Sequence, residues 1–549
     1  MGIDKENGLW YDELLSYSFA KESFPAGIIE SVTKSEFQGI FHYLYLGLWM
    51  ILFGESDISL RFSSLVFGVA LIPVVFFLGK ELYSKGAGLF AALMVSLNPL
   101  LIYYSQEVRP YSLLAFLGAA SFLFLFRAEK KQDFLNYLIL ALCNVLILYT
   151  YTIGFVFVFL QAVVFFIYRK FLVKEPVKGF LPVQAVIWGL YSPYIFSVAN
   201  NFSYYFSSTF IEPFFYSGFN QFSILITLQD WFTPMLFGIY QHDEVFYREI
   251  FLNAGSVGLV VFSFVLLIIA VFLSGLLNSL KIPGGRAYII LLPCLGFLFF
   301  EVLAAINGNF CLVTRHTLLV FPLVFFLCCL GLYMIPHRKL FFSAASVISL
   351  IYLLSFASEN AVPKWERAGI KPVVKFLKEY NLQNTDIVVT PSHSEFVKKY
   401  LPGVKTLEFN YMQAVFLDKS KELLKKFVLD RELIYETTKN TAHARLKPYL
   451  QQKKPSQVLE NYLLNHFSGL EKGRYFIVIR KTDYAMYDEA ELRNLLQDSE
   501  KYKDAAMFRM FVSKIVNDTL NISEKNLKLI KEKEIEPIWR VYVFKKIGA

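Results

Sequence analysis

Ten long apolar segments lie between residues 62 and 357, and they constrain the fold more than any other feature of the chain. Each approaches or exceeds the length that a helix needs to cross a bilayer core of about 30 Å with some tilt. The composition agrees, because 55% of the residues are hydrophobic, more than soluble domains usually carry. The sequence therefore predicts a polytopic α-helical membrane protein. The predicted spans are residues 62–79, 85–103, 110–127, 134–150, 152–168, 180–198, 251–275, 287–306, 317–334 and 340–357.

Basic residues in the connecting loops predict the orientation. Alternate loops carry Lys and Arg, and the positive-inside rule assigns those loops to the cytoplasm. The other loops then face outside, as do the residues before 62 and after 358. They include the turns 105–111 and 149–152 and the long loop 199–250. The net charge of +9 is accordingly attributed to loop residues that orient the spans and not to nucleic-acid binding. No basic motif of a nucleic-acid binder is found. The basic loops carry Lys80, Lys85, Arg127, Lys130, Lys131, Arg169, Lys170, Lys174, Lys178, Lys281, Arg286, His337, Arg338 and Lys339.

The region before residue 62 poses a topological question. An outer N-terminal region needs a signal or a preceding span, yet residues 1–37 are polar and contain neither. Either a first transmembrane helix upstream of Met1 is missing from this sequence, or residues 38–53 are a span and the N-terminus is cytoplasmic. The first alternative is favoured because the apolar run is shorter than the roughly 20 residues of a span. Residues 1–61 are thus predicted to be an outer-face loop with juxtamembrane helices.

After Ser358 the composition becomes that of a soluble chain. Alternating apolar runs predict strands at residues 386–390, 475–480 and 539–545. Helical patterns lie between them, and this alternation predicts an extracytoplasmic α/β domain over residues 359–549. Its expected role is that of a packing lid or partner platform. The helical patterns cover residues 371–379, 420–429 and 489–497.

The sequence offers no evidence for a cofactor. The five cysteines lie in or beside apolar segments without CxxC or metal-ligand spacing, so they are interpreted as packing residues. No cluster has the ligand spacing that would argue for a metal, although a divalent cation stays an open alternative.

Polar clusters on the predicted outer side are the candidates for chemistry. Asp12 and Glu13 are either solvated surface charges or a general base at the membrane surface. Glu107 and Arg109 lie between two apolar spans, where charge is expensive unless it faces protein or water. Arg109 is either a snorkelling anchor with a neighbouring carboxylate or part of an anion site, since guanidinium groups suit phosphate.

Two further basic positions begin predicted spans. Arg315 and His316 precede one span and Arg61 precedes another, and a helix-end anchor is the alternative for each. Three outer arginines together with two sets of carboxylates are nevertheless more than a simple membrane anchor requires.

Several ordered motifs resemble the dolichyl-phosphate-mannose protein mannosyltransferase-like group, which is glycosyltransferase family 39 in its broad bacterial sense. This group shares the GT-C membrane fold with the aminoarabinose transferase of lipid A. The most specific motif is the string Tyr-Ser-Gln-Glu-x-Arg-x-Tyr, which ends at Tyr111 and follows Asn98-Pro99. Together the motifs cover about the first 360 residues in family order. The other motifs are Trp10-Tyr-Asp12-Glu13, Tyr43 through Trp49 ending in Phe53-Gly54, Arg61-Phe-Ser-Ser64, and Arg315-His316 followed by Pro322.

The resemblance implies an inverting glycosyltransferase that moves a sugar from a polyprenyl-phosphate carrier to an acceptor on the outer face. The implied partners are this lipid-linked sugar, membrane lipid and an acceptor protein, lipid or glycan. The implied location is a bacterial inner or cytoplasmic membrane, with the active site and C-terminal domain toward the periplasm or exterior. The family also places the run 41–53 in a juxtamembrane helix. The implied catalytic residues are Asp12 and Glu13, the donor phosphate-binding residues Arg109 and Arg315, and the supporting residues Glu107, Tyr111, Tyr43, Arg61 and His316.

The chain departs from the family at two motifs. The usual His-Pro-Pro-Leu-Tyr-Tyr string aligns with residues 39–44, where both prolines are replaced, and the usual Arg-Tyr pair is Arg315-His316. The alternative is therefore a non-catalytic or transport protein that binds lipid-linked glycans. A transporter should show repeated halves with broken spans, and no such symmetry is found.

Overall fold

A computed structural model of the protein describes residues 8–35, 39–174, 179–200, 223–232, 255–306, 314–361, 369–390, 395–408, 463–464, 467–481, 519–535 and 539–547. The described residues form two compact units. The membrane unit lies between Leu15 and Val362. The C-terminal unit contains the described residues after Pro363 together with those up to Leu14.

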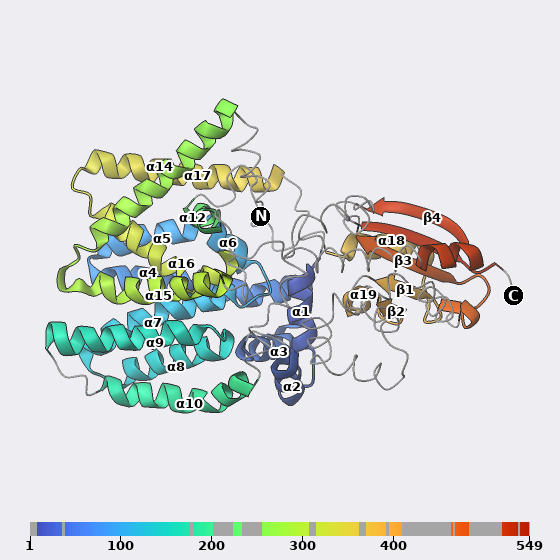
Figure 1. Cartoon of the computed structure of the whole chain (residues 1–549), viewed down its shortest axis with the longest axis horizontal. Helices are drawn as coiled ribbons and strands as arrows, with labels where there is room; N and C mark the ends of the chain where they lie inside the picture. The colour runs from blue at the N-terminus through green and yellow to red at the C-terminus, as the bar shows by residue number, and fades with distance from the viewer. Residues whose placement is uncertain are drawn as a thin grey trace. The chain divides into compact units, whose positions relative to one another are not determined.

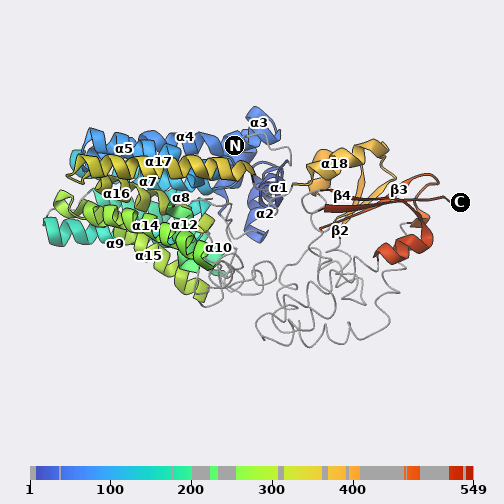
Figure 2. The same cartoon turned by 90° about the horizontal axis from the view of Figure 1, so that it is seen from above.

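The membrane unit is built from helices, most of which run side by side in both views (Figures 1 and 2). Helix α1 (Tyr11–Ala20) crosses the boundary between the two units. The remaining helices are α2 (Ala26–Ser35), α3 (Phe41–Phe53), α4 (Asp57–Leu82), α5 (Lys85–Leu97), α6 (Pro99–Ser105), α7 (Tyr111–Lys131), α8 (Phe134–Thr150), α9 (Gly154–Ile167), π-helical η1 (Tyr168–Val173), α10 (Phe180–Asn200), α12 (Ser223–Phe232), α14 (Gly255–Ser279), η4 (Pro283–Gly285), α15 (Arg286–Ile306), the 3₁₀ helix η5 (Thr314–Leu319), α16 (Phe321–Tyr333) and α17 (Arg338–Ala361).

The apolar segments of the sequence form these helices. Each of the ten predicted spans falls on a helix or a helix pair, from α4 to α17. Within the described residues, four helical segments are long and apolar enough to cross a membrane, and a fifth if a bent pair counts as one span. The polytopic helical membrane fold predicted from the sequence is therefore confirmed. The four segments are Asp57–Leu82, Tyr111–Lys131, Gly154–Val173 and Pro283–Ala304.

Helix α3 is a separate short element. Its 13 residues would extend about 20 Å, which is short of a bilayer core of about 30 Å. It packs on the start of α4, where Tyr45 Oη donates to the Ser63 carbonyl oxygen at 3.0 Å and Trp49 Nε1 to that of Ser59 at 2.9 Å. Both the length and the packing agree with a juxtamembrane helix.

The bent pair consists of α5 and α6, which meet at an angle of 62°. Pro99 begins α6, and proline disfavours the helical conformation in the residue before it, so α5 ends at Leu97. Asn98 then caps the new helix, because its Oδ1 accepts a hydrogen bond from the Leu101 backbone N–H at 3.1 Å. The bend directs α6 into the polar turn that precedes α7.

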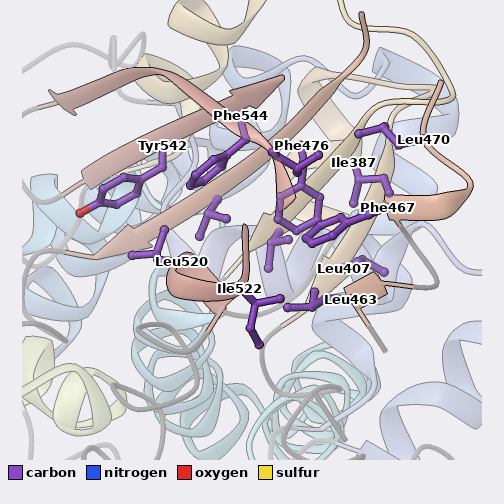
Figure 3. Close-up of a cluster of buried hydrophobic side chains, with 13 residues drawn as sticks. Ile387, Leu407, Leu463, Phe467, Leu470, Phe476, Leu520, Ile522, Tyr542 and Phe544 are labelled. Carbon is purple, nitrogen blue, oxygen red and sulfur yellow. The ribbon is translucent and has the colours of Figure 1, made fainter. Parts of the chain in front are cut away.

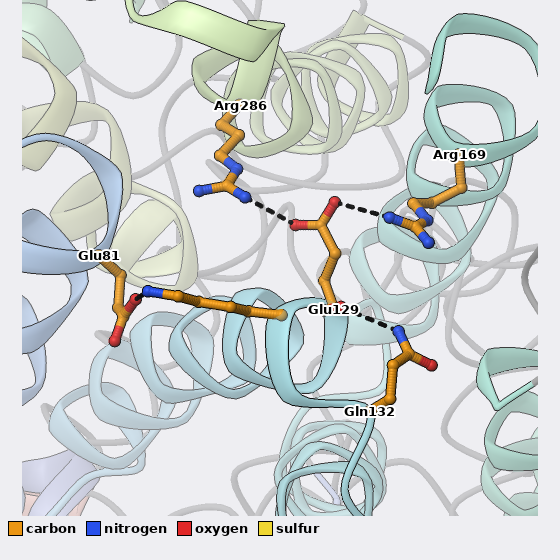
Figure 4. A network of polar contacts seen from close by, with 6 residues as sticks. Glu81, Glu129, Gln132, Arg169 and Arg286 are labelled. Atoms are coloured by element: carbon orange, nitrogen blue, oxygen red, sulfur yellow. Dashed lines mark hydrogen bonds and ion pairs between the residues drawn. The ribbon is translucent and has the colours of Figure 1, made fainter. Parts of the chain in front are cut away.

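The basic loops meet at one end of the membrane unit, hereafter the basic end. Glu129, near the end of α7, accepts ion pairs from Arg169 Nη1 at 3.3 Å and from Arg286 Nη2 at 3.5 Å (Figure 4). Lys130 pairs with Glu81 at 3.4 Å. These contacts join the last turns of α4 and α7 to η1 and the first turn of α15. Among the described residues, the basic ends of these four elements thus meet at one end of the helix bundle.

The C-terminal unit contains a five-stranded mixed sheet with the strand order β2-β1-β3-β5-β4. β1 pairs in parallel with β2 and β3, whereas β5 pairs antiparallel with β3 and β4. One face carries a cluster of buried side chains that includes Phe467, Phe476 and Phe544 (Figure 3). The elements are α18 (Lys371–Leu377), η7 (Lys378–Tyr380), β1 (Ile387–Thr390), α19 (Glu395–Tyr400), β2 (Lys405–Glu408), β3 (Tyr475–Lys481), β4 (Lys528–Ile535) and β5 (Trp539–Lys545).

The predicted α/β domain is confirmed, and its three predicted strands are β1, β3 and β5. The predicted helix 371–379 is α18 with η7. The predicted helices 420–429 and 489–497 lie outside the described residues. The prediction missed β2 and β4. β4 is largely charged and exposed, as is usual for an edge strand that must not pair with other chains, so it shows no apolar alternation.

Candidate functional site

The turn between α6 and α7 lies at the end of the membrane unit opposite the basic end. All of residues 103–111 are buried, including Glu107, which is fully buried, and Arg109, which is 6% exposed. The backbone closes the turn through a 2.7 Å hydrogen bond from the Arg109 N–H to the Glu107 carbonyl oxygen. Ser112 Oγ donates to the Tyr104 carbonyl oxygen at 2.9 Å and so joins the first turn of α7 to α6. The charge pair predicted from the sequence is therefore a buried, internally braced feature.

Arg109 is held by three other segments of the membrane unit. Its Nη1 donates to Ser16 Oγ on α1 at 3.1 Å. Ser64 Oγ on α4 donates to the Arg109 carbonyl oxygen at 3.3 Å. The guanidinium carbon lies 5.7 Å from the centroid of the Tyr111 ring, within cation–π range. These contacts fix both the backbone and the side chain of Arg109.

His42 on α3 also lies near Arg109. Burial, followed by the positive charge of Arg109, lowers the pKa of His42 to about 3, although a hydrogen bond with the Val108 backbone opposes this. The imidazole is therefore neutral at physiological pH. Its Nε2 atom is buried and has no hydrogen-bond partner among the described residues. The sequence analysis did not include His42 among the site residues, because a histidine in an aromatic run is more often a packing residue.

The turn 150–152 brings a second set of side chains to this end. The Gly39 N–H donates to the Thr150 carbonyl oxygen at 3.1 Å, which joins the entry of α3 to this turn. A Cβ atom at residue 39 would lie 2.1 Å from the Tyr149 carbonyl oxygen, so only glycine allows the approach. Within the turn, the Tyr151 hydroxyl donates to Glu301 Oε1 on α15 at 3.2 Å.

Tyr151 connects this set to the arginines. Burial, the Glu301 carboxyl group and Tyr111 raise the pKa of Tyr151 well above its usual value, and Arg315 opposes them. Tyr151 thus interacts electrostatically with Tyr111, whose ring contacts Arg109, and with Arg315. The phenol stays protonated and can donate a hydrogen bond.

Arg315 lies in η5, and a buried carboxyl group on α12 anchors the start of that helix. Thr314 Oγ1 donates to Asp230 Oδ2 at 2.5 Å, and Trp231 Nε1 donates to Thr317 Oγ1 at 2.9 Å. Burial raises the pKa of Asp230 to about 7, against the lowering effect of the Thr314 hydrogen bond. Asp230 is thus poised to change its charge near neutral pH, directly beside the residue that precedes Arg315.

Asp12 and Glu13 occupy the first turn of α1. Glu13 is buried, and its Oε2 accepts a hydrogen bond of 3.1 Å from the Trp10 backbone N–H, the residue just before the helix. This is half of a capping box, in which a third-position Glu satisfies an otherwise open N–H group. Asp12 is half-buried. Both residues belong to the C-terminal unit, whereas the other candidate residues belong to the membrane unit.

The three remaining candidates have different surroundings. Arg61 is fully buried on α4, one turn from Ser64 and on the same helix face. Tyr43 packs in a hydrophobic cluster with Phe19, at a ring-centroid distance of 5.3 Å. His316 is half-buried next to Arg315 in η5. Their supporting roles stay predictions.

Sequence reasoning missed Tyr151, Glu301 and Asp230. Glu301 could have been predicted, because an ionisable residue inside a membrane span is by default a candidate for a functional site. Asp230, which lies on α12, and Tyr151 were both assigned to loops by the sequence prediction, and the composition of those segments does not mark them. Among the residues that the structure describes, no group of three His, Cys, Asp or Glu side chains could hold a metal ion.

The arrangement suits chemistry on a phosphate-bearing substrate. Arg109 and Arg315 belong to one electrostatically connected group with Tyr111, Tyr151 and Glu301. Arginine forks bind phosphate oxygens, and the phenols and the carboxyl group bind hydroxyl groups.

Comparisons with known proteins agree with this organisation. Residues 38–196 match the family model of dolichyl-phosphate-mannose-protein mannosyltransferase. No curated protein matches the sequence.

Solved structures resemble the chain over nearly its whole length. One is ArnT from Cupriavidus metallidurans in the apo state, with 10% identity, a TM-score of 0.50 and coverage of 98% of this chain and 93% of that one. Another is the same protein bound to undecaprenyl phosphate, with 11% identity, a TM-score of 0.51 and the same coverage. The Archaeoglobus fulgidus oligosaccharyltransferase in complex with Zn and sulfate is 13% identical, with a TM-score of 0.42 and coverage of 98% and 85%.

Proposed function

This chain has the fold of the GT-C membrane glycosyltransferases, as its sequence motifs predicted, and on this premise we propose that it transfers a sugar from a polyprenyl-phosphate carrier to an acceptor hydroxyl group. The reaction takes place at the end of the membrane unit opposite the basic end. By the positive-inside rule this end faces the periplasm or the cell exterior.

One observation carries the proposal. Arg109 is buried and contacts the Tyr111 ring, and Arg315, which is half-buried and more than 200 residues away in the sequence, lowers the pKa of Tyr151, the tyrosine that interacts with Tyr111. Two guanidinium groups at the end of a membrane bundle suit a phosphate whose lipid tail stays in the bilayer. The ArnT structure of the same fold is described as bound to undecaprenyl phosphate, which supports a lipid carrier of this class.

In the proposed reaction, one bond forms at the anomeric carbon of the sugar while another bond to the same carbon breaks. The acceptor oxygen forms a bond to the anomeric carbon of the sugar while the bond from that carbon to the phosphate oxygen breaks. The electron pair of the broken bond stays on the lipid phosphate, where the arginines stabilise the additional charge. Attack from the face opposite the phosphate inverts the anomeric configuration.

Asp12 is the proposed general base that takes the proton of the acceptor hydroxyl group. Of the two adjacent carboxylates, Glu13 caps the N-terminus of α1 through the Trp10 backbone N–H, and Asp12 lies half-buried in the same first turn. Asp12 also lies one helical turn before Ser16 on the same face of α1, and Ser16 accepts a hydrogen bond from Arg109.

The test is transfer of a radiolabelled sugar from a synthetic undecaprenyl-phosphate sugar to endogenous acceptors in membranes that contain the protein. The wild type should release undecaprenyl phosphate and give a product of inverted configuration. Asp12→Asn should reduce the rate by about 10²-fold or more, which is the usual contribution of a general base.

Glu22→Gln is the matched control, because it removes an exposed carboxylate from the same N-terminal region and should leave the rate unchanged. Unchanged transfer by Asp12→Asn would exclude Asp12 as the base. Uptake or translocation of the lipid-linked sugar without bond cleavage would instead favour the transport alternative.

A further inference from the structure

Two buried polar atoms belong to residues that interact with Tyr151, and neither atom has a hydrogen-bond partner among the described residues. One is Oε2 of Glu301, a fully buried residue, and the other is the hydroxyl oxygen of Tyr111, a residue 2% exposed. The second carboxyl oxygen, Glu301 Oε1, already accepts from Tyr151. Because a buried polar atom without a partner costs stability, such atoms usually bind a ligand or water.

The position of Glu301 strengthens this point. It lies 15 residues after Arg286, which corresponds to about 22 Å along α15 from the basic end. Burial of a carboxyl group inside a membrane span costs free energy, and such groups usually pair with a partner and mark a functional site. At the basic end, two arginine ion pairs offset this cost for Glu129. Glu301 instead accepts a hydrogen bond from the hydroxyl group of a tyrosine.

The neighbours of this group indicate what it binds. Tyr111 contacts Arg109, and Tyr151 interacts with Arg315. Both arginines are assigned above to the donor phosphate, and the transferred sugar is bonded directly to that phosphate. A group whose members adjoin these two arginines is therefore a candidate for contact with the attached sugar.

The chemistry matches a sugar hydroxyl group. Ionised, the Glu301 carboxyl group accepts a hydrogen bond, and protonated it also donates one, while a phenol does both. Tyr104 packs edge-on against Tyr111 with a centroid distance of 5.2 Å and holds that ring in place.

We propose that Glu301, Tyr151 and Tyr111 form a subsite that binds hydroxyl groups of the transferred sugar and so determines which sugar the protein accepts. Glu301 Oε2 and the Tyr111 hydroxyl group contact the sugar, and Tyr151 positions Glu301. The inference rests on the proposed function, because it assumes that Arg109 and Arg315 hold the donor phosphate.

The test measures binding of three probes to the purified full-length protein in detergent. The probes are undecaprenyl phosphate, undecaprenyl phosphate mannose and undecaprenyl phosphate glucose, followed by monodeoxy analogues of whichever sugar binds better. The wild type should bind one sugar-bearing lipid more tightly than undecaprenyl phosphate and lose about tenfold in affinity for one deoxy analogue, as expected for a lost hydrogen bond to a buried polar group.

Glu301→Gln and Tyr111→Phe should each weaken binding of the complete sugar-bearing lipid about tenfold, yet leave binding of undecaprenyl phosphate unchanged. Each variant should also bind the deoxy analogue that lacks the hydroxyl group contacted by the replaced side chain as well as the wild type does. Tyr151→Phe should reduce the same discrimination less, since it acts through Glu301. Tyr352→Phe is the matched control: it removes another buried tyrosine hydroxyl group, which accepts from Asn98 at 3.2 Å, and should change none of these affinities.

The outcomes separate the two proposals. If the wild type binds undecaprenyl phosphate but the Glu301 and Tyr111 variants lose affinity for all probes equally, or for none, the subsite is wrong and the proposed function survives. If the wild type binds none of the three lipids, both are wrong. Melting temperatures of the variants, measured in the same detergent, show whether each protein is folded.

Discussion

Ser16 and Arg109 are joined by a 3.1 Å hydrogen bond from the guanidinium Nη1 to the serine hydroxyl oxygen, across 93 residues of sequence. The contact is buried and links α1 to the turn between α6 and α7. It connects the part of α1 that belongs to the membrane unit directly to the proposed phosphate-binding arginine.

Ser16→Ala should therefore impair donor handling without unfolding the protein. Loss of one hydrogen bond to a charged group is expected to reduce kcat/KM for the lipid-linked donor about tenfold, because Arg109 keeps its charge but loses an orienting partner. Ser96→Ala is the control, since Ser96 is a half-buried residue whose hydroxyl group donates to the Leu93 carbonyl oxygen within α5. Equal rates for the two variants would show that Ser16 does not orient Arg109.

Substitution of Arg109 itself should have a larger effect. Arg109→Gln removes the charge that stabilises the departing phosphate, and we expect a loss of about 10²-fold or more in kcat/KM. Arg109→Lys keeps the charge but not the planar fork and should recover only part of the rate. Arg127→Gln removes an arginine that lies over Phe77 and pairs with Glu81 at 3.9 Å, and its activity should match the wild type.

Asp230 should make the stability of the membrane unit depend on pH. Burial raises its pKa from 3.8 to about 7, so the folded protein retains a proton that the unfolded chain has lost. Stability is therefore greatest below pH 4 as far as this group is concerned, and it falls as the pH rises toward 7. Between pH 5 and pH 7 the loss should be about 2–3 kcal/mol.

The measurement is the thermal unfolding midpoint of the wild type and of Asp230→Asn at both pH values. The asparagine keeps a carbonyl oxygen that accepts from Thr314 but does not titrate, so the difference between the two midpoints should be smaller in this variant. An identical pH dependence in both proteins would contradict the raised pKa of Asp230.

Glu129 should contribute to stability rather than to catalysis. Glu129→Gln leaves Arg169, whose side chain is 9% exposed, and Arg286 without their carboxylate partner, and we expect a destabilisation of about 2–3 kcal/mol. Glu81→Gln breaks a 3.9 Å pair with Arg127 and a pair whose Lys130 side chain is 67% exposed, so it should cost less than about 1 kcal/mol. Sugar transfer per folded molecule should be unchanged in both variants. A lower turnover at equal folded fraction would assign Glu129 a role in the reaction.

The membrane fold could be predicted from the sequence because its signals are local. Each apolar segment specifies a helix by length alone, and loop charges divide the connections into two sets. The bend at Asn98-Pro99 was not predicted, since residues 85–103 were assigned to one span, although proline and the asparagine cap act within four residues. Charged β4 was missed because an edge strand lacks apolar alternation.

The site was only partly predictable. Glu107, Arg109 and Tyr111 lie within five consecutive residues, so they could be recognised as parts of one motif. The sequence named both Asp12 and Glu13 as catalytic candidates. Only the structure shows that Glu13 caps helix α1 by accepting a hydrogen bond from the Trp10 backbone N–H.

The sequence by itself determined which segments become helices, which loops are basic and which short motif carries the charge pair, because these depend on neighbouring residues. Only the tertiary structure decided that His42 lies near Arg109, that Tyr151 donates to Glu301, and that Asp230 accepts from the residue before Arg315. Helix packing brings together residues more than 100 positions apart, and nothing in a local pattern records which faces of those helices will meet.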